Sequence, residues 1–214
     1  MRSFDYSNLK NRTWDNEILS YVAKIHEFKG RQELYLRQKP VELERLVEIA
    51  KVQSTESSNR IEGIVTTRSR LQQLVEDKTT PRNLDEKEIL GYRNVLNLIH
   101  ENYQYIPLKL NYILQLHRDL LQYTELSYGG KYKTSPNEID AVLPNGEKRI
   151  LFKPLEPYET PDAIEQICSS YQQALDCEIV DSLILIPCVI LDFLCVHPFN
   201  DGNVPLRYQQ QIAA

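Results

Sequence analysis

The chain has 214 residues, 42% of them hydrophobic and 26% charged, which is an ordinary composition for a globular protein with a sizeable core. Its net charge of −5 gives no electrostatic reason to expect nucleic acid or an anionic membrane as a partner. Residues 1–20 contain no apolar run of the kind that marks a secretory signal. The most apolar segment, residues 182–196, is too short to span a bilayer. We therefore expect one domain, or one domain with an appendage.

The amino-terminal part of the chain has helical periodicity. Trp14, Ile18, Val22 and Ile25 are spaced for one face of a helix. Residues 40–54 open with a proline suited to the first helical position. On a helix, one side of this segment is apolar and consists of Leu43, Leu46, Ile49 and Ala50. The next predicted helix covers residues 66–77, and a weak domain boundary falls near residue 80.

Helical segments also dominate the rest of the chain. The longest, residues 83–103, has Asn83 or Asp85 as its candidate cap and acidic residues in its first turn. Residues 160–175 begin Thr-Pro-Asp, which is a good start signal. The remaining predicted helices cover residues 108–123 and the apolar segment 182–196. The sequence therefore predicts an all-α fold.

Residues 127–159 break this pattern, because they contain three of the seven glycines and are rich in proline. Residues 141–152, AVLPNGEKRILF, are typical of two short strands around a Pro-Asn-Gly turn. Two interpretations fit this hairpin: a surface connection between two helices, or a flap over a functional site.

Four cysteines lie in the last quarter of the chain, and they form no CxxC pair: Cys168, Cys177, Cys188 and Cys195. We expect small buried hydrophobic side chains here and not disulfides or metal ligands, as in a reducing cytoplasm.

The segment HPFNDGN, residues 197–203, concentrates groups that handle phosphate. His197 is a candidate general base, and Asp201 offers hard oxygen ligands suited to Mg²⁺. Gly202 and Asn203 would open an anion site if a helix begins just after them. Phe199 can anchor the loop in the core. Taken alone, His197 could be structural and Asp201 a helix cap, but together these residues favour phosphoryl or nucleotidyl transfer.

Three motifs in family order resemble the Fic (Fic/Doc, or Fido) family. HPFNDGN resembles the first seven residues of the signature HPFx[DE]GNGR, and residues 129–139, GGKYKTSPNEI, resemble the target-binding flap GKxRTSxNxI. Residues 57–64, SSNRIEGI, resemble the inhibitory motif [ST]xxxE[GN] through Ser58, Glu62 and Gly63. The resemblance covers most of residues 12–203. It implies an amino-terminal helical extension over 1–80, with the inhibitory motif at 54–64, and a Fic-like core over 81–214, with the flap at about 127–159.

This resemblance implies that the protein transfers AMP from ATP to a Ser, Thr or Tyr hydroxyl of a target protein. His197 would take the hydroxyl proton, Asp201 would hold Mg²⁺ on the phosphates, and Gly202 and Asn203 would bind phosphate. Phe199 would hold the loop in place. Glu62, with Ser58 and Gly63, would form an inhibitory brake.

The flap would align the target protein by strand-like backbone pairing. The residues that match the family's flap are Lys131, Tyr132, Lys133, Thr134, Asn137 and Ile139. Taken alone, the two lysines would simply be solvated. ATP and a hydroxyl-bearing protein are the expected partners, self-association into a homo-oligomer is compatible with the sequence, and nucleic acid and membrane are not expected.

The sequence departs from the family immediately after Asn203. Val204 and Pro205 stand where the signature has Gly and Arg, so a phosphate-orienting guanidinium is missing. Tyr208 replaces the arginine that pairs with the inhibitory glutamate, and Arg207 is one residue too early on a helix to replace it. We therefore expect impaired activity.

The resemblance also implies further core helices after the signature, and we expect a truncation within the signature motif, through a frameshift just after the Asn203 codon. The apolar faces of 108–123 and 182–196 would then lack a cover. Two other functions remain open: a catalytically inactive remnant or helical interaction module, and a changed reaction with another donor or with removal of AMP.

Overall fold

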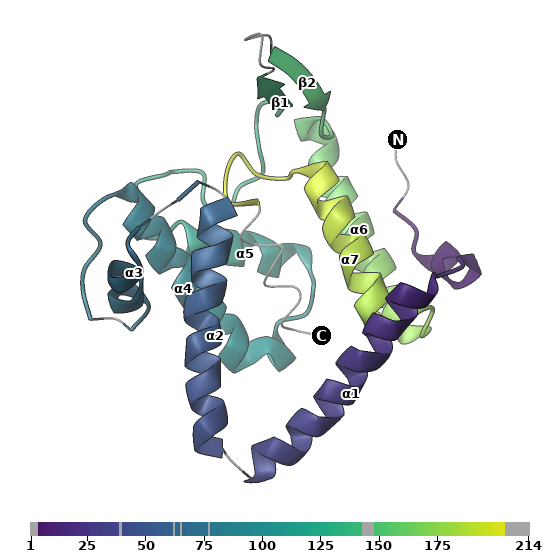
Figure 1. Ribbon diagram of the computed structural model, residues 1–214. Coiled ribbons are helices and arrows are strands. Elements are labelled where there is room, and N and C mark those ends of the chain that lie inside the picture. Colours follow the sequence, from purple (N-terminus) through teal and green to yellow (C-terminus); the bar gives the residue numbers. More distant parts are fainter. Residues whose placement is uncertain are drawn as a thin grey trace.

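The structure is a computed structural model that describes residues 4–38, 40–61, 63–64, 66–76, 78–142 and 148–203. Within these ranges the chain forms seven α-helices, three short 3₁₀ turns and one two-stranded hairpin (Figure 1). The mainly helical fold with a small hairpin is therefore confirmed. Glu62, the hairpin turn at 143–147 and all residues from Val204 onward lie outside the described residues.

The helices follow the predicted segments closely. Their bounds are α1 Asn16–Gln38, α2 Pro40–Ile61, α3 Arg68–Val75, α4 Leu84–Asn102, α5 Leu110–Leu120, α6 Thr160–Asp176 and α7 Ser182–Val196. Of the two candidate caps of α4, Asn83 is the one used: its side chain accepts a hydrogen bond from the Glu86 amide at 2.9 Å. Helix α1 begins at Asn16, so the prediction that Trp14 shares its face is wrong.

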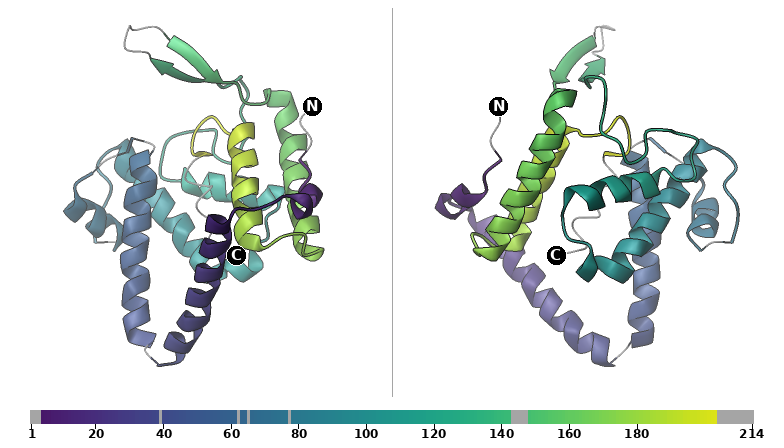
Figure 2. Two further views of the ribbon diagram at one scale, coloured as in Figure 1. Left: turned by 45° about the vertical axis from the view of Figure 1, so that its right-hand side comes forward. Right: turned by 180° about the vertical axis from the view of Figure 1, so that it is seen from behind.

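The main core lies between α4, α5, α6 and α7. Helices α6 and α7 lie side by side and antiparallel, as Figures 1 and 2 show. Tyr92 of α4, Ile164 of α6 and Phe193 of α7 are among the fully buried side chains. Burial of such large apolar surfaces supplies most of the stabilising free energy of a domain.

The amino-terminal residues 4–11 pack against this core. Phe4 and Tyr6 are buried in the same cluster as the helices. The Tyr6 hydroxyl donates to the Asp192 carboxylate at 3.1 Å, and the Ser170 hydroxyl donates to the Phe4 carbonyl at 2.6 Å. The segment before α1 is thus joined to α6 and α7 by specific contacts.

Helices α4 and α5 approach each other very closely at Gly91. A Cβ atom built at this position would lie 1.8 Å from the carbonyl oxygen of Leu120. Only glycine allows this approach without a backbone shift. The contact places the carboxyl-terminal end of α5 beside the loop that follows α7.

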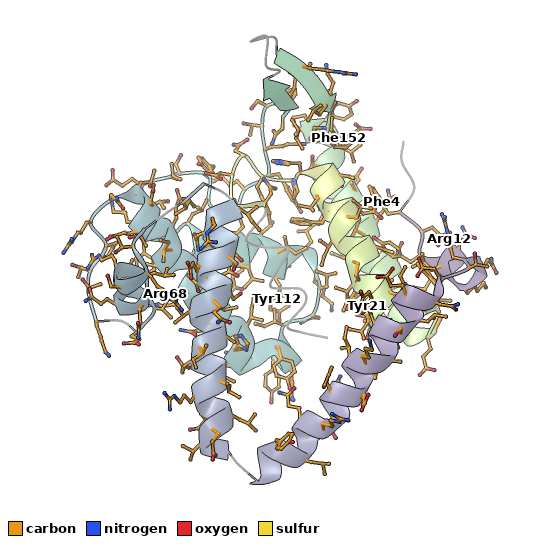
Figure 3. All side chains as sticks on the ribbon, in the orientation of Figure 1. Phe4, Arg12, Tyr21, Arg68, Tyr112 and Phe152 are labelled. Carbon is orange, nitrogen blue, oxygen red and sulfur yellow. The ribbon has the colours of Figure 1, made fainter. Side chains whose placement is uncertain are left out.

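Helices α1 and α2 form a V that extends away from the core (Figures 1 and 2). Figure 3 shows side chains along both arms with no other element beside their distal halves. The predicted apolar side of residues 40–54 exists as a helical face, but Leu46 and Ile49 on it are exposed. Periodicity identified the helix and its face, and it did not show what covers that face.

The hairpin pairs β1 Ile139–Val142 with β2 Lys148–Phe152 in antiparallel register, Val142 opposite Lys148 and Ile139 opposite Phe152. It projects from the body of the molecule near the start of α6, with Phe152 at its base (Figure 3). The two predicted strands are confirmed, and the first begins at Ile139, two residues before the segment read as a hairpin.

All four cysteines are free thiols. Cys168 is buried as expected, and Cys188 and Cys195 are partly buried. Cys177 is exposed, so its predicted burial is wrong; it caps the carboxyl end of α6, where the chain leaves the core. Among the described residues, no helix is both long enough and apolar enough to cross a membrane.

Candidate functional site

The loop His197–Asn203 begins where α7 ends against the core. His197 is the cap residue of α7, with φ 49° and ψ 64° in the left-handed region. Apart from the glycines, Glu178 is the one other described residue with a positive φ. Such a conformation costs free energy in a residue with a side chain, so the surrounding contacts must hold it. Pro198 follows and prevents the helix from continuing.

Two amide side chains hold the His197 ring. The Nδ2 atoms of Asn137 and Asn203 lie 2.9 Å and 3.2 Å from Nδ1 of His197. The same two nitrogens donate to the Phe199 carbonyl, at 3.1 Å and 2.9 Å. An amide nitrogen can only donate, so Nδ1 accepts, and the neutral ring carries its proton on Nε2.

The environment of His197 favours the neutral ring. Burial lowers its pKa from the ordinary value of 6.5, and the nearby Lys133 ammonium lowers the pKa further. Ring hydrogen bonds to the carbonyls of Phe199 and His197 act in the opposite direction, because they stabilise the protonated form. The balance leaves His197 uncharged at neutral pH, as a general base must be.

Lys133 of the flap is buried, which the sequence did not predict. It is 2% exposed, its Nζ donates to the Val196 carbonyl at 3.0 Å, and its backbone amide donates to the Pro198 carbonyl at 2.9 Å. The interpretation of this residue as a solvated lysine is therefore wrong. An ammonium group at the carboxyl end of α7 is also favoured by the helix dipole. Lys131, in contrast, is exposed, and its Nζ donates to the Ser127 carbonyl.

The six flap residues singled out in the sequence divide into two groups. Lys131, Thr134 and Ile139 lie at the surface. Tyr132, Lys133 and Asn137 face the loop instead, Tyr132 by stacking on Phe199 with ring centroids 5.9 Å apart. The inner group joins the flap to His197, which the sequence motif alone did not reveal.

Phe199 lies at the centre of the loop and is 0% exposed. Its ring stacks on that of His117 from α5, with centroids 3.8 Å apart and an angle of 14° between the planes. A stacked, fully buried ring cannot move without losing these contacts, so Phe199 restrains the loop. This packing is what an anchor of the loop requires.

The last three residues of the loop present a carboxylate and two candidate phosphate donors. Asp201 is exposed, and its Oδ1 accepts from the Gly202 amide at 2.7 Å. The Tyr128 hydroxyl is a further hydrogen-bond partner of the Asp201 side chain. Gly202 has a φ of 72°, which favours glycine, and Asn203 is buried with its Oδ1 accepting from the Phe199 amide at 2.9 Å.

The side chains of the loop suit only an Mg²⁺ ion that the protein holds through a single carboxylate. Among the described residues there is no cluster of three or more metal-ligating side chains. Mg²⁺ in nucleotide sites is commonly held by one or two carboxylates together with phosphate oxygens and water. The single exposed carboxylate of Asp201 suits that arrangement and does not suit a closed protein cage.

The end of α2 lies against the same loop. Asn59, Ile64 and Tyr92 line a small hollow of about 20 Å³ together with Asp201 and Gly202. This volume is enough for a water molecule and far too small for a nucleotide. Two of the three inhibitory-motif residues are described: the Ser58 hydroxyl lies 2.9 Å from that of Tyr92, and Gly63 has a φ of 79°.

One residue of this site was missed in the sequence. His117 is fully buried beneath Phe199, with ring nitrogens close to Gly130 and Asp201. The available signal was its place on α5, three residues before Leu120 and four after Ile113, both buried apolar residues. A lone polar side chain on an apolar helical face is one that the fold must satisfy internally.

Comparison with known proteins gives a family match over part of the chain. A model of the Fic/DOC family matches residues 107–205, which include the flap and the loop. A comparison with curated proteins gave no match.

Several solved structures share the fold. A Fic domain-containing signalling protein from Bacteroides thetaiotaomicron superposes with a TM-score of 0.70 at 26% identity, covering 80% of this chain and 64% of that one. A Fic family protein from Desulfovibrio desulfuricans gives 0.72 at 16% identity, covering 94% and 58%. Fic-1 from C. elegans gives 0.68 at 16% identity, covering 92% and 58%.

The chain thus spans about three fifths of the length of the solved structures that it matches. The family model matches the segment that contains the flap and the loop, and the likeness to the solved structures shows that the chain has the fold of Fic proteins.

Proposed function

We propose that the site is built for Fic-type adenylyl transfer, in which AMP passes from ATP to a hydroxyl side chain of a target protein. The observation that carries this proposal is the joint placement of His197, Asn137, Lys133 and Asp201 by the flap and the loop. A neutral imidazole, an exposed carboxylate and backbone amides at a glycine turn suit nucleotidyl transfer. The match of residues 107–205 to the Fic/DOC family model supports the same reaction.

The reaction forms one bond and breaks one. The target hydroxyl oxygen attacks the α-phosphorus of ATP, the bond from that phosphorus to the bridging oxygen breaks, and pyrophosphate leaves. His197 takes the hydroxyl proton. In this arrangement its proton is on Nε2, so uptake at Nε2 requires that the ring proton moves to Nδ1 and that the Asn137 and Asn203 amide nitrogens turn away from that atom.

Asp201 would hold Mg²⁺, which neutralises the phosphates and stabilises the departing pyrophosphate when it is bound. The Gly202 amide is engaged by Asp201 at 2.7 Å in this structure. With the carboxylate engaged in holding the cation, that amide would be available to donate to a phosphate oxygen. Asn203 fixes the turn by its two hydrogen bonds to the Phe199 backbone.

The target protein would be bound by the outer group of flap residues. Strand β1 has an unpaired edge, because the hairpin contains two strands only within the described residues. An extended segment of the target can add to this edge through backbone hydrogen bonds, with Thr134 and Ile139 exposed beside it. The inner group, Tyr132, Lys133 and Asn137, would set the loop and not touch the target.

The inhibitory motif would act on this site from the end of α2. Asn59 and Ile64 lie against Asp201 and Gly202, so the end of α2 reaches the phosphate-binding turn. We propose that Glu62 obstructs productive phosphate placement. Tyr208, where an arginine partner is usual, makes this brake weaker than in a complete motif.

The test compares two variants by intact-protein mass spectrometry after incubation with ATP and Mg²⁺. The Glu62→Gly protein is expected to gain the mass of one or more AMP groups, because the brake is removed. The double variant Glu62→Gly, His197→Ala is expected to gain none, since the base is lost. A folded Glu62→Gly protein that never gains AMP would overturn the proposal.

A second candidate, a non-catalytic helical interaction module, is favoured by Val204 and Pro205, which replace the Gly-Arg of the signature. Loss of the arginine removes a bidentate phosphate contact. This candidate predicts that Mg²⁺ and ATP leave the thermal unfolding midpoint unchanged. A rise in that midpoint, abolished by Asp201→Ala, would exclude it as the sole function.

A further inference from the structure

His117 joins two segments that are far apart in the sequence. It lies in the last turns of α5 and is 0% exposed. Its Nδ1 accepts from the Gly130 amide at 3.0 Å, and its Nε2 lies 3.1 Å from the Asp201 carbonyl oxygen. Gly130 begins the inward part of the flap, and Asp201 is in the loop.

These two partners leave one arrangement of protons. A backbone amide can only donate and a carbonyl can only accept, so Nδ1 is unprotonated and Nε2 carries the hydrogen. Unlike an asparagine amide, neither partner can be turned round to reverse its role. A proton on Nδ1 would face the Gly130 amide hydrogen, so the same two contacts hold the ring neutral, with one donor and one acceptor.

The backbone around His117 is shaped to meet the ring. Gly130 and Gly202 have φ values of 73° and 72°, in the region that favours glycine. A Cβ at Gly202 would lie 3.4 Å from the ring's Nε2 and Cδ2 atoms. On its face the ring stacks on Phe199 at 3.8 Å. The flap and the loop therefore both approach one imidazole from α5 through glycine turns.

We propose that His117 is a positioning residue that fixes the base of the flap to the loop, and so sets where Asp201 lies relative to the flap. Its role divides by atom: Nδ1 holds Gly130, Nε2–H holds Asp201, and the ring supports Phe199. The consequence for Mg²⁺ and ATP rests on the proposed function. The two attachments themselves do not, because both are contacts between parts of this chain.

The first test is the tautomer of His117 in the wild-type protein. A long-range ¹H–¹⁵N spectrum, assigned by comparison with His117→Phe, distinguishes a ring protonated on Nε2 from one protonated on Nδ1. The Nε2–H form is expected. An Nδ1–H or charged ring at neutral pH would overturn the proposal.

The second test separates the two attachments by amide hydrogen exchange. Asparagine places an oxygen near the position of Nδ1, and glutamine places a nitrogen near that of Nε2. His117→Asn is expected to retain protection of residues 128–134 while residues 199–203 exchange roughly tenfold faster. His117→Gln is expected to show the reverse, and His117→Phe to lose both.

Protection of α3 and α4 serves as the internal control, and it is expected to stay unchanged in all three variants. If His117→Asn and His117→Gln changed the exchange rates of both segments equally, His117 would only fill space. The same conclusion would follow if His117→Phe changed neither exchange rate. Neither test uses ATP. A protein that transfers no AMP can therefore still pass both tests, and the two proposals fail separately.

Discussion

At the scale of single residues, the site depends on side chains that its motifs did not identify as internal. His197, Asp201 and Asn203 could be identified as candidate site residues from HPFNDGN, because their residue types alone indicate the chemistry of the loop. The inward direction of Lys133 and Asn137 could not be predicted, since side-chain direction in an irregular segment depends on what packs against it. Their contacts with Val196, Phe199 and His197 exist only in the folded chain.

The tautomer of His197 provides a residue-scale prediction. Asn137→Asp replaces a donor to Nδ1 with an acceptor of nearly the same shape. The carboxylate is expected to move the ring proton to Nδ1 and to raise the pKa of His197 by roughly one to two units, as a neighbouring opposite charge does. A titration followed by the ring's NMR signals measures both effects.

Asn137→Ala is the matched control, because it removes the donor without adding a charge. It is expected to leave the ring neutral at pH 7, with no group at position 137 that favours a proton on either ring nitrogen. A wild-type ring that already carries its proton on Nδ1 would contradict the arrangement of amides described around His197.

At the scale of elements, α3 is held to α4 by a buried ion pair. Arg70 Nε and Nη2 donate to the two Glu86 carboxylate oxygens at 2.9 Å and 2.8 Å. The Arg82 amide also donates to Glu86 at 2.8 Å, and Arg70 reaches the Thr80 carbonyl. Since both partners are buried, removal of either leaves an uncompensated charge in the interior.

Glu86→Ala is therefore expected to lower the free energy of unfolding by about 3 kcal/mol. Glu101→Gln removes an exposed carboxylate at the end of the same helix and is expected to change it by less than about 0.5 kcal/mol. Chemical denaturation at pH 7 compares the two variants. A Glu86 variant as stable as the Glu101 variant would show that the pair contributes nothing net.

The same pair predicts a pH dependence. The hydrogen bonds from Arg70 hold the pKa of Glu86 below its ordinary value of 4.5, so the folded state favours the ionised carboxylate. The resulting stabilisation is complete above pH 4.5 and is lost as the pH falls through the lowered pKa. Unfolding measured between pH 7 and pH 3 should therefore show a steeper loss in the wild type than in Glu86→Ala.

The elements themselves were the most predictable part of the fold. Asn83 before an acidic first turn and Thr-Pro-Asp before residue 163 gave helix starts within one residue of α4 and α6. The ends of α5 were overextended, because periodicity continues through Lys109 and Leu121, whose backbones are no longer helical. Local signals set where a helix can begin, and tertiary contacts decide where it ends.

At the scale of the whole molecule, two apolar surfaces lie uncovered by the residues that the structure describes. One is the outer part of the V, where Phe28 and Leu34 of α1 are each 61% exposed. The other is a groove of about 320 Å³ between α4, α5, α6 and α7, lined by Tyr112, Leu116 and Val189 among others. The groove shares no residue with the loop or the flap, so it is not the candidate site.

Exposed apolar patches of this kind promote self-association. Replacing both Phe28 and Leu34 by Gln is expected to reduce concentration-dependent association in sedimentation velocity. The free energy of unfolding is expected to change by less than about 0.5 kcal/mol, because neither side chain is buried. Association that is unaltered by the double variant would place the interface elsewhere on the molecule.

The central claim, that the site transfers the AMP part of ATP, is tested most directly by the position of the transferred label. Glu62→Gly protein is incubated with Mg²⁺ and ATP labelled either at the α- or at the γ-phosphorus, and the protein is then denatured and counted. The account predicts stable label from α-labelled ATP alone, lost in the Glu62→Gly, His197→Ala double variant. Label from γ-labelled ATP, or label that persists without His197, would contradict it.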